Sequence, residues 1–144
     1  MLNHIVEESL RVFPGSPVNP GSFQDQISCA REDVLELISR HLTEFGDKFP
    51  AETCQNGFYP LTDNVEWTTS FWTGQLWLAW EMSGEEKFRA MAEKHVRSFG
   101  LRIAGRNDTN THDLGFLYTL SCVAAWRLTG NREARGFSLD RKSV

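Results

Sequence analysis

The chain has 144 residues, enough for one domain with a buried core, and its formal net charge is -4. Hydrophobic residues make up 40% and charged residues 24%, which is ordinary for a soluble globular protein. Lysines and arginines are scattered, so the sequence argues against a nucleic-acid partner. No apolar segment is as long as a signal sequence or a membrane span requires. We therefore expect a cytoplasmic protein without a membrane partner.

Aromatic residues reach 12%, and five of them are tryptophans. Tryptophan mostly fills a core or offers a flat surface on which a ligand stacks. The three cysteines, Cys29, Cys54 and Cys122, are odd in number and far apart. They match neither a disulfide framework nor a metal-site spacing, so we expect free thiols and no metal.

A breaker-rich segment with Pro14, Pro17 and Pro20 separates a short amphipathic start from the rest of the chain. We therefore predict that residues 1–25 form an N-terminal segment and linker, and that residues 26–144 form one helical domain.

Apolar residues recur at steps of three and four from Ile27 to Phe45, which predicts a helix that stops at Gly46. Residues 47–66 read as a long loop, and loops of this length are often functional. The next segment, 68–82, is apolar nearly all round and predicts a helix that is buried on most sides.

An amphipathic helix follows from Glu85, with acids in its first turn. A polar loop at 105–110 leads to a second apolar helix, from about Asp113 to Leu128. The final residues, 136–144, read as the beginning of another helix.

The two apolar helices end in matching segments, Ala79–Gly84 and Ala125–Gly130, which are offset by 46 residues (125 minus 79). Such a period is typical of stacked helical hairpins. An open α-solenoid and a closed α/α barrel both fit. We favour an all-α fold of the α/α-barrel type, a six-hairpin toroid of which two to three hairpins are present, because inner barrel helices are apolar all round.

The 46-residue shift places Asp113 over Trp67, each at the start of an apolar helix. Helix starts favour anionic ligands, and a carboxylated sugar would suit them. Taken alone, Asp113 could be a capping residue and His112 an ordinary loop residue. Trp67, Trp72 and Phe116 lie near the same helix starts in the sequence, and aromatic faces beside carboxylates commonly hold sugar rings.

Two motifs, residues 67–81 (Trp-Thr-Thr-Ser-Phe-Trp-Thr-Gly, then Leu-Trp-Leu-Ala-Trp-Glu) and residues 111–118 (Thr-His-Asp-Leu-Gly-Phe-Leu-Tyr), resemble those of the unsaturated glucuronyl hydrolases, glycoside hydrolase family 88. The resemblance covers about residues 26–136. It implies a six-hairpin α/α barrel and a glycoside hydrolase that releases 4,5-unsaturated uronic acid from oligosaccharides left by polysaccharide lyases. Unsaturated chondroitin and hyaluronan disaccharides are examples, and no cofactor is implied.

The resemblance also assigns the site. Asp113 would be the first of two active-site aspartates, His112 would lie beside it, and Trp67 would stack on the substrate. The second aspartate would follow about 60 residues later, beyond Val144. We therefore expect a truncated chain with little activity alone.

Ser70 departs from the glycine usual in the family and is expected to crowd the cleft. An unsaturated rhamnogalacturonyl hydrolase fragment and a non-catalytic helical-repeat interaction module remain as alternatives. Self-association through exposed inner helices is a further expectation.

Overall fold

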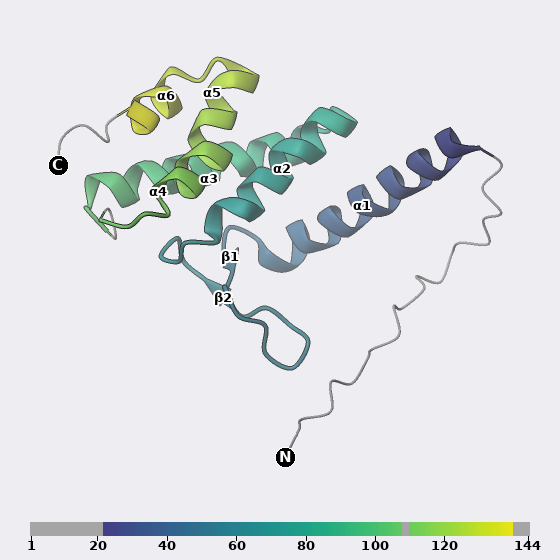
Figure 1. The fold of residues 1–144 in the computed structure, drawn as a ribbon, viewed down its shortest axis with the longest axis horizontal. Coiled ribbons are helices and arrows are strands. Elements are labelled where there is room, and N and C mark those ends of the chain that lie inside the picture. The colour runs from purple at the N-terminus through teal and green to yellow at the C-terminus, as the bar shows by residue number, and fades with distance from the viewer. Residues whose placement is uncertain (1–21, 108–109, 140–144) are drawn as a thin grey trace.

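The computed structural model describes residues 22–107 and 110–139, and they are largely helical. Figure 1 shows the helices stacked side by side around α2 and α3. The elements in chain order are α1 (Phe23–Phe45), β1 (Phe49–Pro50), β2 (Leu61–Thr62), α2 (Thr69–Ser83), α3 (Glu86–Ala104), α4 (Leu114–Tyr118), the π-helical turn η1 (Thr119–Val123), α5 (Ala124–Thr129) and α6 (Arg132–Leu139). In these two ranges, no helix is both long and apolar enough to cross a bilayer.

Helix α1 begins where a serine can cap it. Ser22 has an extended backbone, and its hydroxyl accepts a hydrogen bond from the Asp25 backbone N–H at 3.2 Å. Residues 23–25, which the sequence placed in the linker, are therefore helical, and the linker's earlier residues lie outside the described range. The predicted stop is confirmed: α1 ends at Phe45, and Gly46 has a φ of 56°.

The segment predicted as a loop, 47–66, contains a small antiparallel pair of strands. Phe49 pairs with Thr62 and Pro50 with Leu61. No alternating run marks these strands in the sequence, because each has only two residues. Phe49 is the part of this pair that enters the core, where its ring lies 4.3 Å from the ring of His95.

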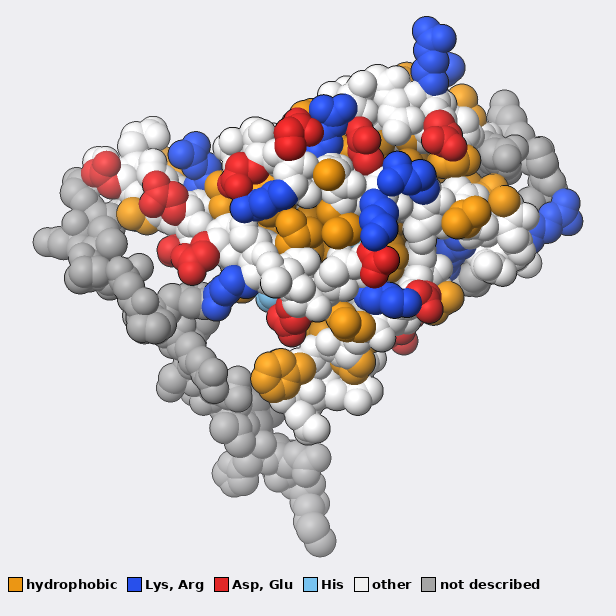
Figure 2. All heavy atoms as spheres, turned by 180° about the vertical axis from the view of Figure 1, so that it is seen from behind, with side chains coloured by type: hydrophobic (Ala, Val, Ile, Leu, Met, Phe, Trp, Pro, Cys, Tyr) orange, Lys and Arg blue, Asp and Glu red, His pale blue; other side chains and the backbone are white. Residues whose placement is uncertain are grey.

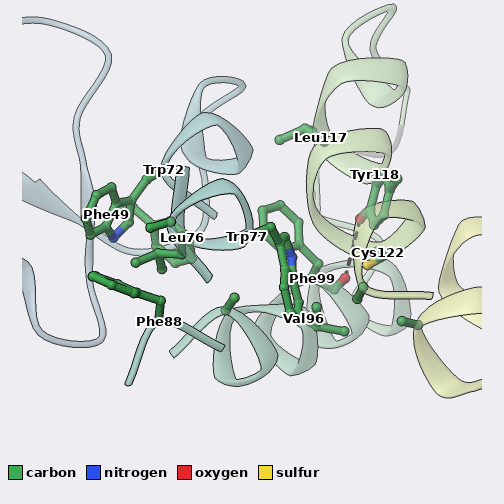
Figure 3. Packing of buried hydrophobic residues seen from close by; sticks show 14 of the residues in the cluster. Phe49, Trp72, Leu76, Trp77, Phe88, Val96, Phe99, Leu117, Tyr118 and Cys122 are labelled. Carbon is green, nitrogen blue, oxygen red and sulfur yellow. Dashed lines mark hydrogen bonds between the residues drawn. The ribbon is translucent and has the colours of Figure 1, made fainter. Parts of the chain in front are cut away.

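The core gathers around α2, which is confirmed within one residue at each end of its predicted range. Trp72, Leu76, Trp77 and Ala79 are buried on this helix, and Phe88, Val96 and Phe99 meet them from α3. Figure 3 shows these side chains interleaved, with Tyr118 and Cys122 approaching from α4 and η1. Burial of aromatic and aliphatic surface on this scale is the main stabilising term in a domain of this size.

The 46-residue repeat is visible in the hydrogen bonds that end the two inner helices. Gly84 and Gly130 both have a φ of 72°, a left-handed conformation that glycine adopts without strain. The Gly84 N–H donates to the Trp80 carbonyl at 2.7 Å, and the Gly130 N–H donates to the Trp126 carbonyl at 2.9 Å. The two inner helices therefore end in the same capping structure.

The repeat extends into the helices that follow. Arg89 lies over the Trp80 ring at 5.3 Å, and Arg135, which is 46 residues later, lies over the Trp126 ring at 5.2 Å. Helix α6 begins at Arg132, as α3 begins at Glu86. The helix start that the sequence placed at residue 136 is thus four residues too late.

Asn131 explains why α6 starts early. Its side-chain oxygen accepts from the Ala134 backbone N–H at 3.0 Å, which is the geometry of a helix cap. Asp140 and the residues after it lie outside the described part of the chain.

The second apolar helix, predicted as continuous from Asp113 to Leu128, is interrupted. It consists of α4, the π-helical turn η1 and α5. A π-turn inserts a wider loop of backbone into a helix, and such turns are frequent at functional sites. Nothing in the apolar pattern distinguishes a π-turn from ordinary helix, so sequence periodicity could not locate it.

Two kinds of surface cover the described residues. Helix α2 exposes Phe71, Leu78 and Met82 along one side, although it is buried on the others. On the face seen in Figure 2, acidic and basic side chains are interspersed among apolar patches, without a broad area of one charge.

Candidate functional site

The starts of α2 and α4 lie against each other. The Ser70 hydroxyl donates to the Phe116 carbonyl at 3.1 Å, and these residues are 46 positions apart. One turn further along, Gly74 lies against Leu120: a Cβ added at Gly74 would meet the Leu120 Cβ at 3.4 Å. The two inner helices therefore pack with equivalent positions facing each other, which brings their N-terminal ends together.

Ser70 does not have the position that the sequence predicted for it. Its side chain is completely buried and bonded between the two helices, so it does not crowd an open cleft. The hydroxyl instead joins the first turn of α2 to the first turn of α4.

Three exposed rings form a row across these helix starts, which we call the aromatic row: Trp67, Phe71 and Phe116. The Trp67 and Phe71 rings meet edge to face with centroids 6.1 Å apart. The Phe71 and Phe116 rings are stacked, also at 6.1 Å and with 29° between their planes. An exposed row of aromatic faces is suited to hold the apolar faces of sugar rings.

Trp72 is not part of this row, although the sequence grouped it with Trp67. Its side chain is only 2% exposed and lies in the core beside Phe45. Phe71 takes the exposed place instead. Helical geometry could have identified it, since residues four apart share a helix face whereas Trp67 and Trp72 are five apart.

Asp113 directly precedes α4, at its N-cap position, but its carboxylate makes no capping hydrogen bond. One carboxylate oxygen, Oδ2, accepts from the Thr111 hydroxyl at 3.2 Å. The other, Oδ1, lies 3.4 Å from His112 Nε2. The reading of Asp113 as a mere cap is therefore not supported, and its side chain, 18% exposed, is held by its own loop.

His112 lies on the solvent side of this carboxylate. Its side chain is 93% exposed, so solvent reaches the imidazole from almost every direction. The structure thus brings His112 and Asp113 into contact and places Phe116 one turn further along α4. Trp67 is linked to Phe116 through its contact with Phe71 in the aromatic row.

A buried arginine that was not predicted from the sequence binds the backbone segments that precede α2 and α4. Arg102 is 3% exposed at the end of α3. Its guanidinium donates to the carbonyls of Val65 and Glu66, at 3.3 Å and 2.9 Å, in the segment that leads to Trp67. Its Nε donates to the Asn107 carbonyl at 3.4 Å, in the loop that leads to Asp113.

Arg102 is therefore a positioning residue for both segments. The sequence places it on an amphipathic helix, where an arginine is normally a surface residue. Its place in the last turn of α3, next to the loops, was the only sign in the sequence of this positioning role.

Tyr118 is buried at the end of α4 and keeps its proton. Burial raises the pKa of Tyr118 to about 12, and its hydroxyl donates to the Phe99 carbonyl at 3.4 Å. The phenol can therefore act as a structural donor at neutral pH but not as a base. Within residues 22–107 and 110–139, no three His, Cys, Asp or Glu side chains are grouped so that they could hold a metal ion.

Comparison with known proteins gives consistent results. No protein-family model matches the chain. The chain is 40% identical over 116 residues to the unsaturated chondroitin disaccharide hydrolase of Streptococcus pneumoniae, a match that covers 81% of this chain and 29% of that protein. It is also 40% identical over 112 residues to the unsaturated glucuronyl hydrolase of Bacillus sp. (strain GL1), a match that covers 78% of this chain and 30% of that protein.

The fold agrees with the sequence. The Bacillus sp. GL1 crystal structure superimposes with a TM-score of 0.74 over 78% of this chain and 30% of that one. An aspartate-to-asparagine variant of the Streptococcus agalactiae enzyme, complexed with dGlcA-GalNAc6S, superimposes with a TM-score of 0.76 at 37% identity, over 81% of this chain and 33% of that one. The predicted partial α/α barrel is confirmed, and the chain spans about 30% of the length of the curated relatives it matches.

Proposed function

Because the chain belongs to the unsaturated glucuronyl hydrolases over the part of these enzymes that it spans, we propose that it carries one wall of their substrate cleft. The substrate is a short oligosaccharide that ends in a 4,5-unsaturated uronic acid. The names of the relatives favour this class over an unsaturated rhamnogalacturonyl hydrolase or a non-catalytic repeat module.

The chemistry follows from the substrate's vinyl ether. A proton adds to C4 of the double bond, and the oxygen of a water molecule adds to C5, which becomes a hemiketal carbon. The hemiketal opens the ring, and the hemiacetal left at C1 then collapses and releases the remaining sugar. A carboxylic acid at the cleft must give the first proton and take one from water, so the reaction is acid–base catalysis without a carboxylate pair flanking C1.

Asp113 is the catalytic residue that we assign to this chain. It holds the hydroxyls of the unsaturated ring, His112 binds beside it, and Trp67 stacks on the ring. The single observation that supports this assignment is the carboxylate geometry: at the N-cap position of α4 the Asp113 carboxylate makes no capping bond and is instead held by Thr111, next to the aromatic row.

Binding and turnover can be tested separately on the 144-residue chain. We expect an unsaturated chondroitin disaccharide to bind, as measured by calorimetry, and its ultraviolet absorbance from the double bond to persist, because the second aspartate of the family has no assigned counterpart here. Trp67→Ala and Asp113→Asn should each weaken binding roughly tenfold or more.

Asp63→Asn is the matched control, because Asp63 is an exposed carboxylate paired with Lys48 on the β-strand side of the molecule. Binding that is unchanged by both Trp67→Ala and Asp113→Asn would contradict the proposed site. Loss of the double-bond absorbance would contradict the expectation that the chain alone is inactive.

We also propose that a second copy of the chain covers the exposed side of the C-terminal half of α2, away from Phe71. Leu78 and Met82 are exposed on a helix that is otherwise buried, and exposed apolar patches favour association. Light scattering should give a mass above 16.4 kDa that falls when Leu78 is replaced by lysine. Leu101→Lys, at an exposed leucine on α3, is the control and should leave the mass unchanged. A monomer at all concentrations would refute this proposal.

A further inference from the structure

The first half of α1 is exposed on nearly all sides. From residue 23 to residue 34, Cys29 alone is partly buried, and the other residues are exposed. Phe23, Ile27 and Val34 follow each other at steps of four and seven, so they share one face of the helix. Three helical turns are marginal in water unless an apolar face is packed against something. This face is therefore suited to a partner that covers it.

The end of α2 lies at the same end of the molecule as the start of α1 (Figure 1). Two further apolar side chains, Leu78 and Met82, are exposed there. We call the exposed apolar residues of these two helix segments the first edge: Phe23, Ile27, Val34, Leu78 and Met82.

Acidic side chains accompany the first edge. Between residues 23 and 36, one arginine stands among four acids: Asp25, Glu32, Asp33 and Glu36. Glu81 is exposed beside Met82 at the end of α2. The first edge is therefore apolar and carries an excess of negative charge.

The 46-residue repeat shows an opposite charge at the other end of the molecule. In α3, Arg89 is paired with Glu86 at 3.5 Å and with Glu93 at 3.2 Å. In α6, the positions of these two acids are occupied by Arg132 and Leu139. The second hairpin therefore has a cation and an apolar residue where the first hairpin has two carboxylates.

The surface of α6 is consequently positive and apolar. We call its exposed leucine and the arginines around it the second edge: Leu139, Arg127, Arg132 and Arg135. No ion pair joins these arginines to a carboxylate of the described residues. An open hollow on α6 is lined by Gly136, Phe137 and Leu139, together with Glu133. This hollow can receive an apolar helix face.

We propose that the second edge of one copy binds the first edge of the next, so that copies of the chain associate head to tail. Because α1 and α6 lie at opposite ends of the stack, the two edges that meet belong to different copies (Figure 1). Unlike charges favour this contact, whereas a contact between two first edges would bring like charges together. The inference rests on the self-association proposed above and names the surface of the second copy that covers α2.

The first test is light scattering of the 144-residue chain over a range of concentrations. A head-to-tail contact leaves one edge free at each end, so the mass should rise past that of two chains, where a two-fold symmetric dimer would stop. Raising the salt concentration from about 0.05 M to about 0.5 M should weaken association roughly threefold or more, because salt screens the charges of both edges.

Two variants each remove one edge. Leu78→Lys places a cation on the first edge and should weaken association roughly tenfold or more. Arg132→Glu combined with Leu139→Glu should do the same at the second edge. This double variant restores the two acids of α3 at the equivalent positions, so α6 keeps its fold. Arg97→Glu, at an exposed position of α3 outside both edges, is the control and should leave the mass unchanged.

Mixing the two variants distinguishes the possible contacts. Each variant alone should be a monomer, but each keeps one intact edge, so an equimolar mixture should have the mass of two chains and no more. A mixture that stays monomeric while the unaltered chain associates would overturn the head-to-tail contact and leave the covering of α2 standing. An unaltered chain that stops at two copies would do the same. An unaltered chain that is monomeric at all concentrations would refute the self-association itself.

Discussion

The two helical hairpins are alike where they end and differ where they begin. Both inner helices close on a left-handed glycine, and both are followed by an arginine stacked on a tryptophan. At their starts, the first hairpin presents Trp67 and the second presents Asp113 at equivalent positions. The C-terminal ends of the inner helices are therefore the same in both hairpins, while the residues at their N-terminal ends, at the cleft, differ from one hairpin to the next.

The inner helices differ in continuity as well. α2 is regular throughout, whereas its counterpart contains the π-turn η1. The first hairpin also holds the larger side chains in the core, and the comparison predicts that it contributes more to stability.

The largest effect is expected at the equivalent positions Trp77 and Val123. Trp77 is 1% exposed, and Trp77→Ala should lower the free energy of unfolding by about 3–5 kcal/mol. Val123→Ala should lower it by about 1 kcal/mol, because Val123 is smaller and only partly buried. Urea denaturation measures both, and equal losses would contradict the unequal contribution of the two hairpins.

Arg102 tests whether one residue of the first hairpin positions the starts of both inner helices. Arg102→Met removes its bonds to the Val65, Glu66 and Asn107 carbonyls and should lower the free energy of unfolding by about 3 kcal/mol. The fluorescence of Trp67, taken as the difference from a Trp67→Phe variant, should shift toward that of a fully solvated indole. Arg97→Met, at an exposed position, is the control; a Trp67 spectrum unchanged in Arg102→Met would leave the arginine with no positioning role.

His95 gives the first hairpin a dependence on pH. Burial, with a smaller effect from Lys94, lowers the pKa of His95 to about 4 from 6.5, so the folded state binds fewer protons than the unfolded state between these values. The stability that neutral His95 contributes is present above pH 6.5 and is lost as the pH falls toward 4, by up to about 3 kcal/mol. Urea midpoints between pH 7 and 4 measure it.

His95→Gln should flatten this pH profile, because no imidazole then has to remain neutral in the core. His112→Gln is the control, since its side chain is 93% exposed and should leave the slope unchanged. A slope that survives His95→Gln would assign the pH dependence to other groups.

The smallest effect should be equal in the two hairpins. Gly84→Ala and Gly130→Ala each place a side chain at a φ of 72° and should each lower the free energy of unfolding by about 1 kcal/mol. Asparagine, which tolerates this conformation better, should cost less at both positions. A loss at Gly84 several times that at Gly130 would show that the two caps are not equivalent.

Periodicity in the sequence predicted the long elements. α2 was predicted at 68–82 and lies at Thr69–Ser83. The prediction succeeded because an apolar helix between Gly46 and Gly84 has few other ways to bury its side chains. The β1–β2 pair and η1 escaped prediction, since two-residue strands and a single π-turn leave no periodic signal.

The candidate site could be predicted only in part. The repeat placed Trp67 and Asp113 at equivalent helix starts, and the structure agrees. Phe71 was overlooked in favour of Trp72, which lies on the buried side of the helix. Arg102 depends on contacts between α3 and two loops that are distant in the sequence, and no local pattern reports such contacts.

Each hairpin closes its inner helix with its own glycine and with a hydroxyl bond, from Ser83 in the first and Thr129 in the second, both 2.7 Å long. Units that carry their own closing bonds can lose structure one at a time. Among the described residues, α6 packs mainly on its near neighbours α3, η1 and α5, so its amides should exchange with solvent first. Those of α2 should exchange last, and the order of exchange should follow the order of the hairpins.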